Sequence, residues 1–249
     1  MAAITGIPCL LGVLYISTTC KQAELYPPNS TKDTQHPQPN THIFTLPFTV
    51  LVLGNAFVAL GLFVPYFYIV QFASTQISQT DINYFPPHYL LSLLNTGSTL
   101  GRLLLPALSD IRPLSRFGVI VPSSALAGLS TILWALCSTT QQTAVYVSLY
   151  GFFSGGFIGL VTPCIAQMTL PDCGILGRRI GALYTLVAFP SLVGPPLAGL
   201  ILDKANDSSS SLGMRTRGWQ ALGGFSGGVM LCGAFLLAFS WRMVGAVRR

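Results

Sequence analysis

Charged side chains are scarce along this sequence. They make up 8% of the 249 residues, and only seven of them are acidic, whereas soluble domains carry about 25% charged residues. A chain this poor in charge could not cover a water-exposed surface of its own size. Long runs contain no Asp, Glu, Lys or Arg at all: 34–80, 117–171, 180–202 and 218–241. Since a membrane span needs about 20 mostly apolar residues, the composition predicts a polytopic membrane protein.

Chemically reactive groups are also few, and this absence argues against an enzyme. The six cysteines show no CxxC or paired spacing, which favours buried thiols over a disulfide framework or a metal site. No HExxH, phosphate-binding loop or Ser/His/Asp set occurs, and the apolar runs hold no acid that could act as a general base. The net charge of +6 is spread over short connections instead of one basic face. We therefore expect no catalytic residues, no metal, no cofactor and no nucleic-acid partner.

What is present is a set of six apolar segments, each long enough to span a bilayer. Their approximate ranges are 46–72, 88–108, 117–137, 144–169, 180–202 and 219–241, and they predict an all-α transmembrane bundle over residues 46–242. Before them, residues 20–45 are polar and Pro-rich, which is typical of a flexible linker. Residues 1–19 are apolar around Pro8 and form a marginal segment, either a short seventh span or the remnant of one.

The distribution of basic residues predicts the orientation of the bundle. Of the 13 Lys and Arg residues, Arg102 lies within a span; with the linker in the cytoplasm, nine lie on the cytoplasmic side and three on the other. This bias follows the positive-inside rule, and it puts a basic tail, residues 243–249, in the cytoplasm. Asn206 begins an Asn-Asp-Ser sequon in the outer loop, so it is a candidate glycosylation site.

Glycines recur at a spacing of four within two of the segments, at Gly151, Gly155 and Gly159 and again at Gly224 and Gly228. This spacing lets neighbouring helices approach closely. It predicts tight packing of these segments, and a flexible point in a moving helix is the alternative.

Arg102 lies inside the apolar segment 88–108, among leucines and small polar residues. A cation in the middle of a bilayer costs roughly 2.5–3.5 kcal/mol on insertion scales, so it normally faces a bundle interior or a water-filled cavity. A guanidinium presents a planar fork that pairs with a carboxylate through two hydrogen bonds. Arg102 is therefore a candidate for a substrate or proton pathway. The alternative is a structural role, in which it packs against Asn95, Thr96 and Ser98 or reaches toward the cytoplasmic interface.

Four short motifs follow one another along the sequence. They are Gly61-Leu62-Phe63-Val64-Pro65-Tyr66-Phe67-Tyr68-Ile69, then Gly101-Arg102 with Pro106-Ala107-Leu108-Ser109-Asp110, Arg112 and Arg116, then Tyr150-Gly151-Phe152-Phe153-Ser154-Gly155-Gly156-Phe157, and finally Val193-Gly194-Pro195-Pro196-Leu197-Ala198-Gly199. In this order they resemble the seventh, eighth, tenth and eleventh helices of major facilitator superfamily transporters. The resemblance is strongest to the fungal monocarboxylate-transporter-like (monocarboxylate porter) family.

The resemblance implies the C-terminal six-helix half of a twelve-helix fold, with residues 1–19 as the remnant of a sixth helix. In that superfamily the substrate binds at the bilayer midplane between two halves, so this chain would need a second six-helix half or a second copy of itself. The implied function is transport of small organic anions or monocarboxylates, with secondary-metabolite export as its setting, protons as a candidate co-substrate and the plasma membrane as its location. The alternative is a truncated, inactive half-transporter or an accessory membrane protein.

The resemblance also implies roles for individual residues in binding. Arg102 matches the arginine that holds the anionic substrate, and Asn95, Ser98 and Tyr66 are candidate neighbours. Ser98 stands where animal members carry an aspartate that serves in proton coupling.

Two further motifs are implied outside the substrate site. Asp110, Arg112 and Arg116 match the loop that locks cytoplasmic helix ends in one conformation, with a plain topogenic loop as the alternative. Gly194, Pro195 and Pro196 match a helix-packing motif.

Overall fold

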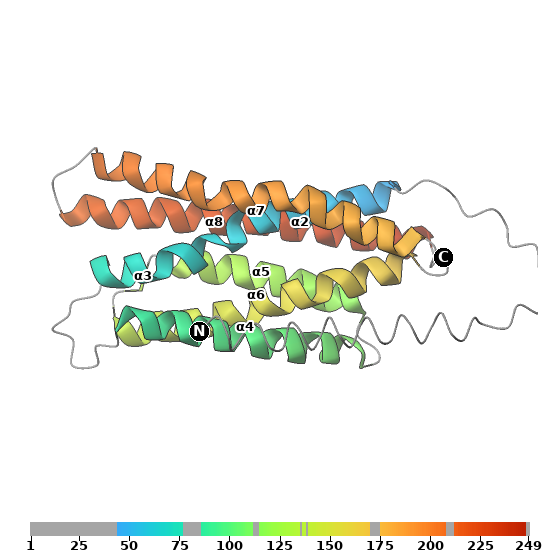
Figure 1. Ribbon diagram of the computed structural model, residues 1–249, viewed down its shortest axis with the longest axis horizontal. Coiled ribbons are helices and arrows are strands. Elements are labelled where there is room, and N and C mark those ends of the chain that lie inside the picture. The colour runs from blue at the N-terminus through green and yellow to red at the C-terminus, as the bar shows by residue number, and fades with distance from the viewer. Residues whose placement is uncertain are drawn as a thin grey trace, which may run out of the picture. The chain divides into compact units, whose positions relative to one another are not determined.

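The computed structural model describes residues 44–76, 86–111, 115–134, 136–137, 139–169, 175–207 and 212–247, all within the unit His42–Arg249. The fold of these residues is all-α, as predicted, and no strand occurs among them. The helices are α2 (Leu46–Leu62), α3 (Val64–Gln76), α4 (Pro87–Ser109), α5 (Arg116–Trp134), α6 (Thr140–Thr169), α7 (Leu176–Asp207) and α8 (Leu212–Val247) (Figure 1). The predicted segment 1–19 and all of the predicted linker 20–45 except its last two residues lie outside the described ranges, as do Arg112 and residues 248–249.

Five stretches of helix are long and apolar enough to cross a membrane: Leu46–Thr75, Arg116–Trp134, Thr140–Thr169, Leu176–Lys204 and Gly218–Gly245. The predicted span 88–108 corresponds to α4, which has 23 residues and is about 35 Å long at 1.5 Å per residue. α4 is not among the five, because polar side chains occupy one of its faces. α8 continues to Val247, so most of the expected basic tail extends the last helix.

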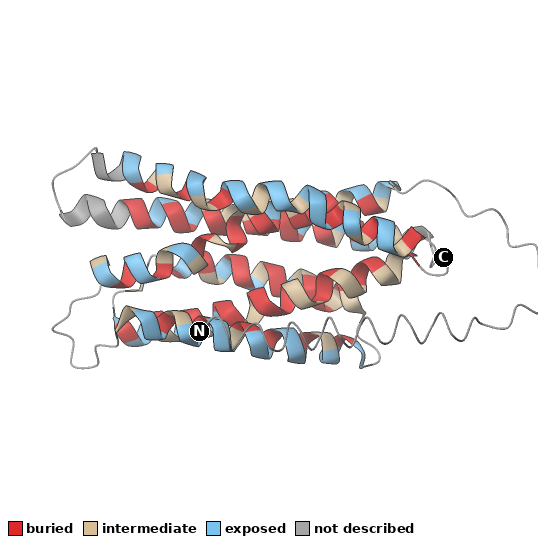
Figure 2. Cartoon of the chain, in the orientation of Figure 1, coloured by how far each residue is buried: buried red, intermediate tan, exposed pale blue. Residues whose placement is uncertain are grey.

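Each helix has one or two main packing partners. α4 lies along α6, α2 contacts both α8 and α7, and α5 contacts both α8 and α6. α7 contributes least to the interior. Only 17% of the residues in its most apolar stretch are buried, whereas the other four spans have 44–56% buried. Figure 2 shows the exposed residues that run along α7 and along α4. One long face of each of these two helices is therefore left uncovered by the described chain.

The contact between α4 and α6 depends on glycine. A Cβ added to Gly97 would lie 2.7 Å from the Ser148 carbonyl oxygen, and one added to Gly155 would lie 2.6 Å from Ser98 Cα. Atoms of the main chain, which cannot move aside alone, fill these positions. On α6 the predicted small-residue spacing thus marks a seam where two helix backbones touch, and this seam fixes the position of α4 on the bundle. For Gly224 and Gly228 on α8 the prediction of tight packing is wrong, because an added Cβ at either would meet nothing within 4 Å in the described part of the chain.

The first apolar segment is interrupted at Phe63, which separates α2 from α3. Pro65 has no N–H to donate to the carbonyl of Gly61, four residues earlier. Ser226 on α8 supplies the missing donor, with its Oγ 2.8 Å from the Gly61 oxygen, and Tyr150 on α6 donates its hydroxyl to the carbonyl of Leu62. Neighbouring helices therefore satisfy the backbone groups that the break sets free, as a membrane interior requires.

Candidate functional site

Polar side chains form a line along the uncovered face of α4. They are the exposed residues His88, Ser92, Asn95, Thr96, Thr99 and Arg102, called the polar stripe below. The face of α4 that packs toward α6 lies beside the stripe and buries Leu90, Leu94, Ser98, Gly101, Leu105 and Ser109; exposed leucines such as Leu100 and Leu103 occupy the side of α4 that points away from α6. The division follows helical spacing, because residues three or four apart share a face. The stripe explains why α4 is less apolar than the other helices.

Most of the stripe is satisfied within its own helix. Asn95 Nδ2 donates to the carbonyl of Leu91 at 3.0 Å, and the Thr99 hydroxyl donates to the carbonyl of Asn95 at 2.9 Å. Ser92 and Thr96 make the same bond to the residue four positions earlier. Arg102 differs: within the described part of the chain its guanidinium has no hydrogen-bond or ion-pair partner. It is the cation of the stripe that can accept an external anion.

Arg102 also lies against α6. A Cβ added to Gly159 would lie 3.2 Å from the Arg102 carbonyl oxygen and 3.3 Å from its Cα. Asp110 is the next acidic residue after Arg102 in the chain, and it pairs with Arg116. No carboxylate of the stripe compensates the charge of Arg102, since the stripe contains none.

The structure brings together only part of the binding set predicted from the sequence. Asn95 shares the polar stripe with Arg102. Ser98 is 4% exposed and faces α6 instead, where its hydroxyl has no hydrogen-bond partner in the described structure. Tyr66 is half-buried on α3 and lies with its hydroxyl 3.1 Å from Ser154 Oγ. Neither Ser98 nor Tyr66 belongs to the stripe.

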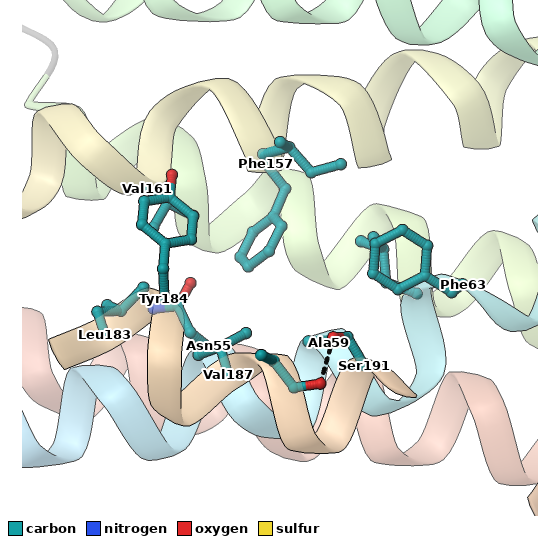
Figure 3. Close-up of a pocket in the computed structure, with 12 residues that line it drawn as sticks. Asn55, Ala59, Phe63, Phe157, Val161, Leu183, Tyr184, Val187 and Ser191 are labelled. Atoms are coloured by element: carbon teal, nitrogen blue, oxygen red, sulfur yellow. Dashed lines mark hydrogen bonds between the residues drawn. The ribbon is translucent and has the colours of Figure 1, made fainter. Parts of the chain in front are cut away.

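A cavity of about 280 Å³ lies between α2, α6 and α7. Its walls include Phe63 on α2's end, Phe157 and Ile158 on α6, and Leu183 and Tyr184 on α7. In Figure 3 the Phe157 ring extends from α6 toward the space between α2 and α7. No sequence motif indicated this cavity, because mostly apolar residues on three separate helices form it.

The polar groups of the cavity wall already have partners inside the protein. Asn55 Nδ2 donates to the carbonyl of Leu51 at 2.8 Å, and the Ser191 hydroxyl donates to the carbonyl of Ala188 at 2.8 Å. The Tyr184 hydroxyl lies 2.9 Å from Thr162 Oγ1 on α6. No acidic or basic residue lines the cavity. Its chemistry is therefore apolar.

Two of the three predicted loop residues are in contact. Arg116 Nη2 lies 3.6 Å from Asp110 Oδ1, in an ion pair that is partly exposed. Arg116 Nη1 also donates to the carbonyl of Pro163 at 3.3 Å. These bonds join the end of α4, the start of α5 and the last third of α6, which contains Pro163. Exposed ion pairs contribute little energy, about 0–1 kcal/mol, so they suit a contact that forms and breaks.

The Gly194-Pro195-Pro196 motif lies in the middle of α7. A Cβ on Gly194 would lie 3.1 Å from the Leu60 carbonyl carbon on α2, and the Tyr68 hydroxyl donates to the carbonyl of Pro195 at 3.0 Å. Pro196 is exposed. The first two residues of the motif thus hold α7 against α2 and α3. Asn206 lies in the last turn of α7, where only the backbone is described.

Arg179 is one of the nine basic residues that the positive-inside rule puts on the cytoplasmic side, and it also makes contacts between helices. It is 6% exposed, its Nη1 donates to Thr169 Oγ1 at 3.3 Å, and its guanidinium lies 5.4 Å from the centroid of the Phe48 ring. It joins the start of α7 to the end of α6 and the start of α2. Adjacent Arg178 is exposed, because successive residues of a helix point about 100° apart.

Sequence comparison finds relatives among fungal transporters, although no family model matches the chain. The chain is 30% identical over 202 residues to the MFS-type transporter pynF of Aspergillus niger, covering 81% of this chain and 42% of that protein. It is 26% identical to the MFS-type transporter hasB of Aspergillus fumigatus (85% of this chain, 49% of that protein). It is 27% identical to the aspyridones efflux protein apdF of Emericella nidulans (74% and 35%). The chain thus spans less than half the length of these relatives.

Structural comparison agrees with this relationship. The fold matches the crystal structure of an auto-inhibited peptide transporter of the POT family with a TM-score of 0.62 and 19% identity, over 79% of this chain and 37% of that one. The chain is therefore a multi-pass membrane protein with the fold of part of a major facilitator superfamily transporter, and its sequence relatives are transporters of that superfamily.

Proposed function

We propose that this chain forms half of a membrane transport pathway for small organic anions and that Arg102 binds the anion. The observation that carries the proposal is the exposed guanidinium on the polar stripe of α4, which has no partner in the described chain. A cation and a row of hydroxyl and amide groups would be costly against lipid tails. They suit a water-filled pathway, where a substrate carboxylate supplies the missing counter-charge.

The second half of the pathway comes from another six-helix bundle, either a separate chain or a second copy of this one. The open faces of α4 and α7 are where such a bundle would pack. Export of secondary metabolites across the plasma membrane is the direction we propose, because apdF is named as an aspyridones efflux protein and another relative as a fujikurins efflux protein. The Asp110–Arg116 pair would close and open as one bundle rocks against the other.

Proton coupling, if it drives this transport, requires a group other than residue 98. Ser98 cannot titrate in the physiological range, and its side chain is buried against α6. We propose monocarboxylates as the smallest members of the substrate class, since one guanidinium matches one carboxylate.

The test is efflux of a labelled organic acid from cells that express this chain, alone and together with the N-terminal half of a full-length relative. Arg102→Gln should lower the rate at least tenfold, because the neutral amide cannot replace the counter-charge, and Arg102→Lys should retain part of it. Arg178→Gln, at another exposed arginine, is the matched control and should be neutral. Rates equal to an empty-vector control in both settings would support the inactive-half alternative instead.

A further inference from the structure

The backbone of Arg102 and the wall of the apolar cavity meet neighbouring parts of α6. Arg102 packs its backbone against Gly159 of α6, and Ile158, the next residue, lines the cavity. Thr162 follows Gly159 by three residues, a spacing that puts the two side by side on the helix surface. Its hydroxyl pairs with that of Tyr184, which also lines the cavity. One turn of α6 therefore links the backbone of Arg102 to the wall of the cavity.

The cavity cannot hold an anion by itself. Its wall contains no basic residue, and the polar groups of Asn55, Tyr184 and Ser191 already make hydrogen bonds inside the protein. A carboxylate moved into this space would lose its hydration without a charged partner, which is costly. An apolar group moved into it would leave water and gain contact with Phe157 and Leu183. The cavity and Arg102 thus suit the two ends of one amphipathic molecule.

The volume of the cavity indicates the size of the apolar end. A dry apolar cavity of about 150 Å³ is enough to bind benzene, and drug-sized ligands occupy about 300–1,000 Å³. At about 280 Å³, this cavity fits a group near the size of two fused aromatic rings. A two- or three-carbon acid would leave most of it empty.

We propose that the cavity between α2, α6 and α7 is a subsite for the apolar part of the substrate, and that the substrate is an amphipathic carboxylic acid with a bulky apolar group. This inference rests on the proposed role of Arg102 as the anion-binding residue. If the inference holds, the preferred substrates are larger carboxylic acids and not the smallest monocarboxylates.

The test measures equilibrium binding of three probes to the purified chain in detergent: 2-naphthoate, acetate and the neutral 2-naphthalenemethanol. Each buried methylene-sized group contributes about fourfold in affinity, so 2-naphthoate should bind at least about a hundredfold more tightly than acetate. Ala188→Phe, which places a ring at the cavity wall, should weaken 2-naphthoate at least tenfold and leave acetate unchanged. Ser191→Leu is a second filling variant. Ala221→Phe, at an exposed alanine of α8 that does not line the cavity, is the matched control.

Arg102→Gln separates this inference from the proposed function. It should weaken both carboxylates by a similar factor and leave 2-naphthalenemethanol unchanged. If Arg102→Gln weakens the carboxylates but Ala188→Phe and Ser191→Leu leave 2-naphthoate unaffected, the subsite is wrong and the anion site stands. If the filling variants weaken all naphthyl probes equally and Arg102→Gln has no effect, the cavity binds neutral apolar molecules such as lipid chains, and both proposals are overturned. Circular dichroism and size-exclusion profiles equal to wild type show that each variant is folded.

Discussion

Replacing Gly155 by alanine should loosen the seam between α4 and α6. The new Cβ would lie 2.6 Å from Ser98 Cα, where 3.4 Å is the lower limit of an ordinary contact. Because the Ser98 carbonyl oxygen lies closer still to this Cβ, the two helices must separate locally by more than about 0.8 Å, the difference between these two distances. A gap of this size removes about a quarter to a half of the dispersion attraction between the atoms that face each other.

The expected cost follows from that displacement. Overpacking a close-packed interface costs about 1–3 kcal/mol, so we expect Gly155→Ala to lower the free energy of unfolding by about 2 kcal/mol. For a chain of this length, this corresponds to a fall in Tm of about 4–8 °C. Because the seam also positions the backbone of Arg102 against Gly159, the same variant should weaken carboxylate binding.

Gly228→Ala is the matched control for this experiment. It makes the same chemical change in the middle of α8, where a Cβ would meet nothing within 4 Å. Alanine in an unobstructed helix position is favoured over glycine by about 0.5–1 kcal/mol, so this variant should be slightly stabilised. Thermal unfolding in one detergent, followed by circular dichroism, compares the two proteins directly. An equal or higher Tm for Gly155→Ala would refute the close approach of the two backbones.

Three further predictions concern the ends of the helices. Arg179→Met should lower the free energy of unfolding by about 2–3 kcal/mol, because a charged hydrogen bond and a cation–π contact are lost. The control Arg178→Met should change it by less than about 0.5 kcal/mol. Equal effects of the two variants in thermal unfolding would contradict the buried position of Arg179. Arg116→Gln should alter transport rate with little change in Tm, because the pair with Asp110 is exposed. Burial raises the pKa of the Cys137 thiol, so the thiol stays neutral to higher pH in the folded protein than in the denatured protein. Maleimide labelling of Cys137 should therefore be slower in the folded protein until the pH exceeds that raised pKa. Identical labelling rates in the folded and denatured protein would argue against the burial.

The fold class was accessible from the sequence because it depends on composition and length alone. Runs without charge predicted membrane helices, and the glycine spacing at 151, 155 and 159 indicated the seam with α4. The orientation of single side chains was not accessible in the same way, since apolar helices give little periodic signal about which face is covered. Ser98 lies one turn before Arg102, and the sequence did not show that its hydroxyl is buried against α6 while Arg102 is exposed.

Contacts between distant segments escaped prediction for a related reason. Arg178 and Arg179 are equivalent as neighbours in sequence, and it is Arg179 that the fold places against Thr169 and against Phe48, some 130 residues earlier. The break at Phe63 likewise depends on whether Ser226 and Tyr150 can reach the carbonyls that it frees. The apolar cavity, formed by three helices, is the largest feature of the site that no local motif could indicate.

Several helix-to-helix hydrogen bonds share one property: the acceptor is a main-chain carbonyl. Gly61, Leu62, Pro47, Pro163 and Pro195 each accept a bond through their backbone oxygen. A carbonyl is present whatever the side chain, so mutation at the acceptor position leaves the bond intact and only the donor is under chemical constraint. In each such pair, the residue that supplies the carbonyl can therefore change during evolution without loss of the interhelical bond. This asymmetry is one route by which chains that share only 26–30% identity with their relatives can keep the same packing, and it predicts that tolerance to substitution will be lowest at the donors.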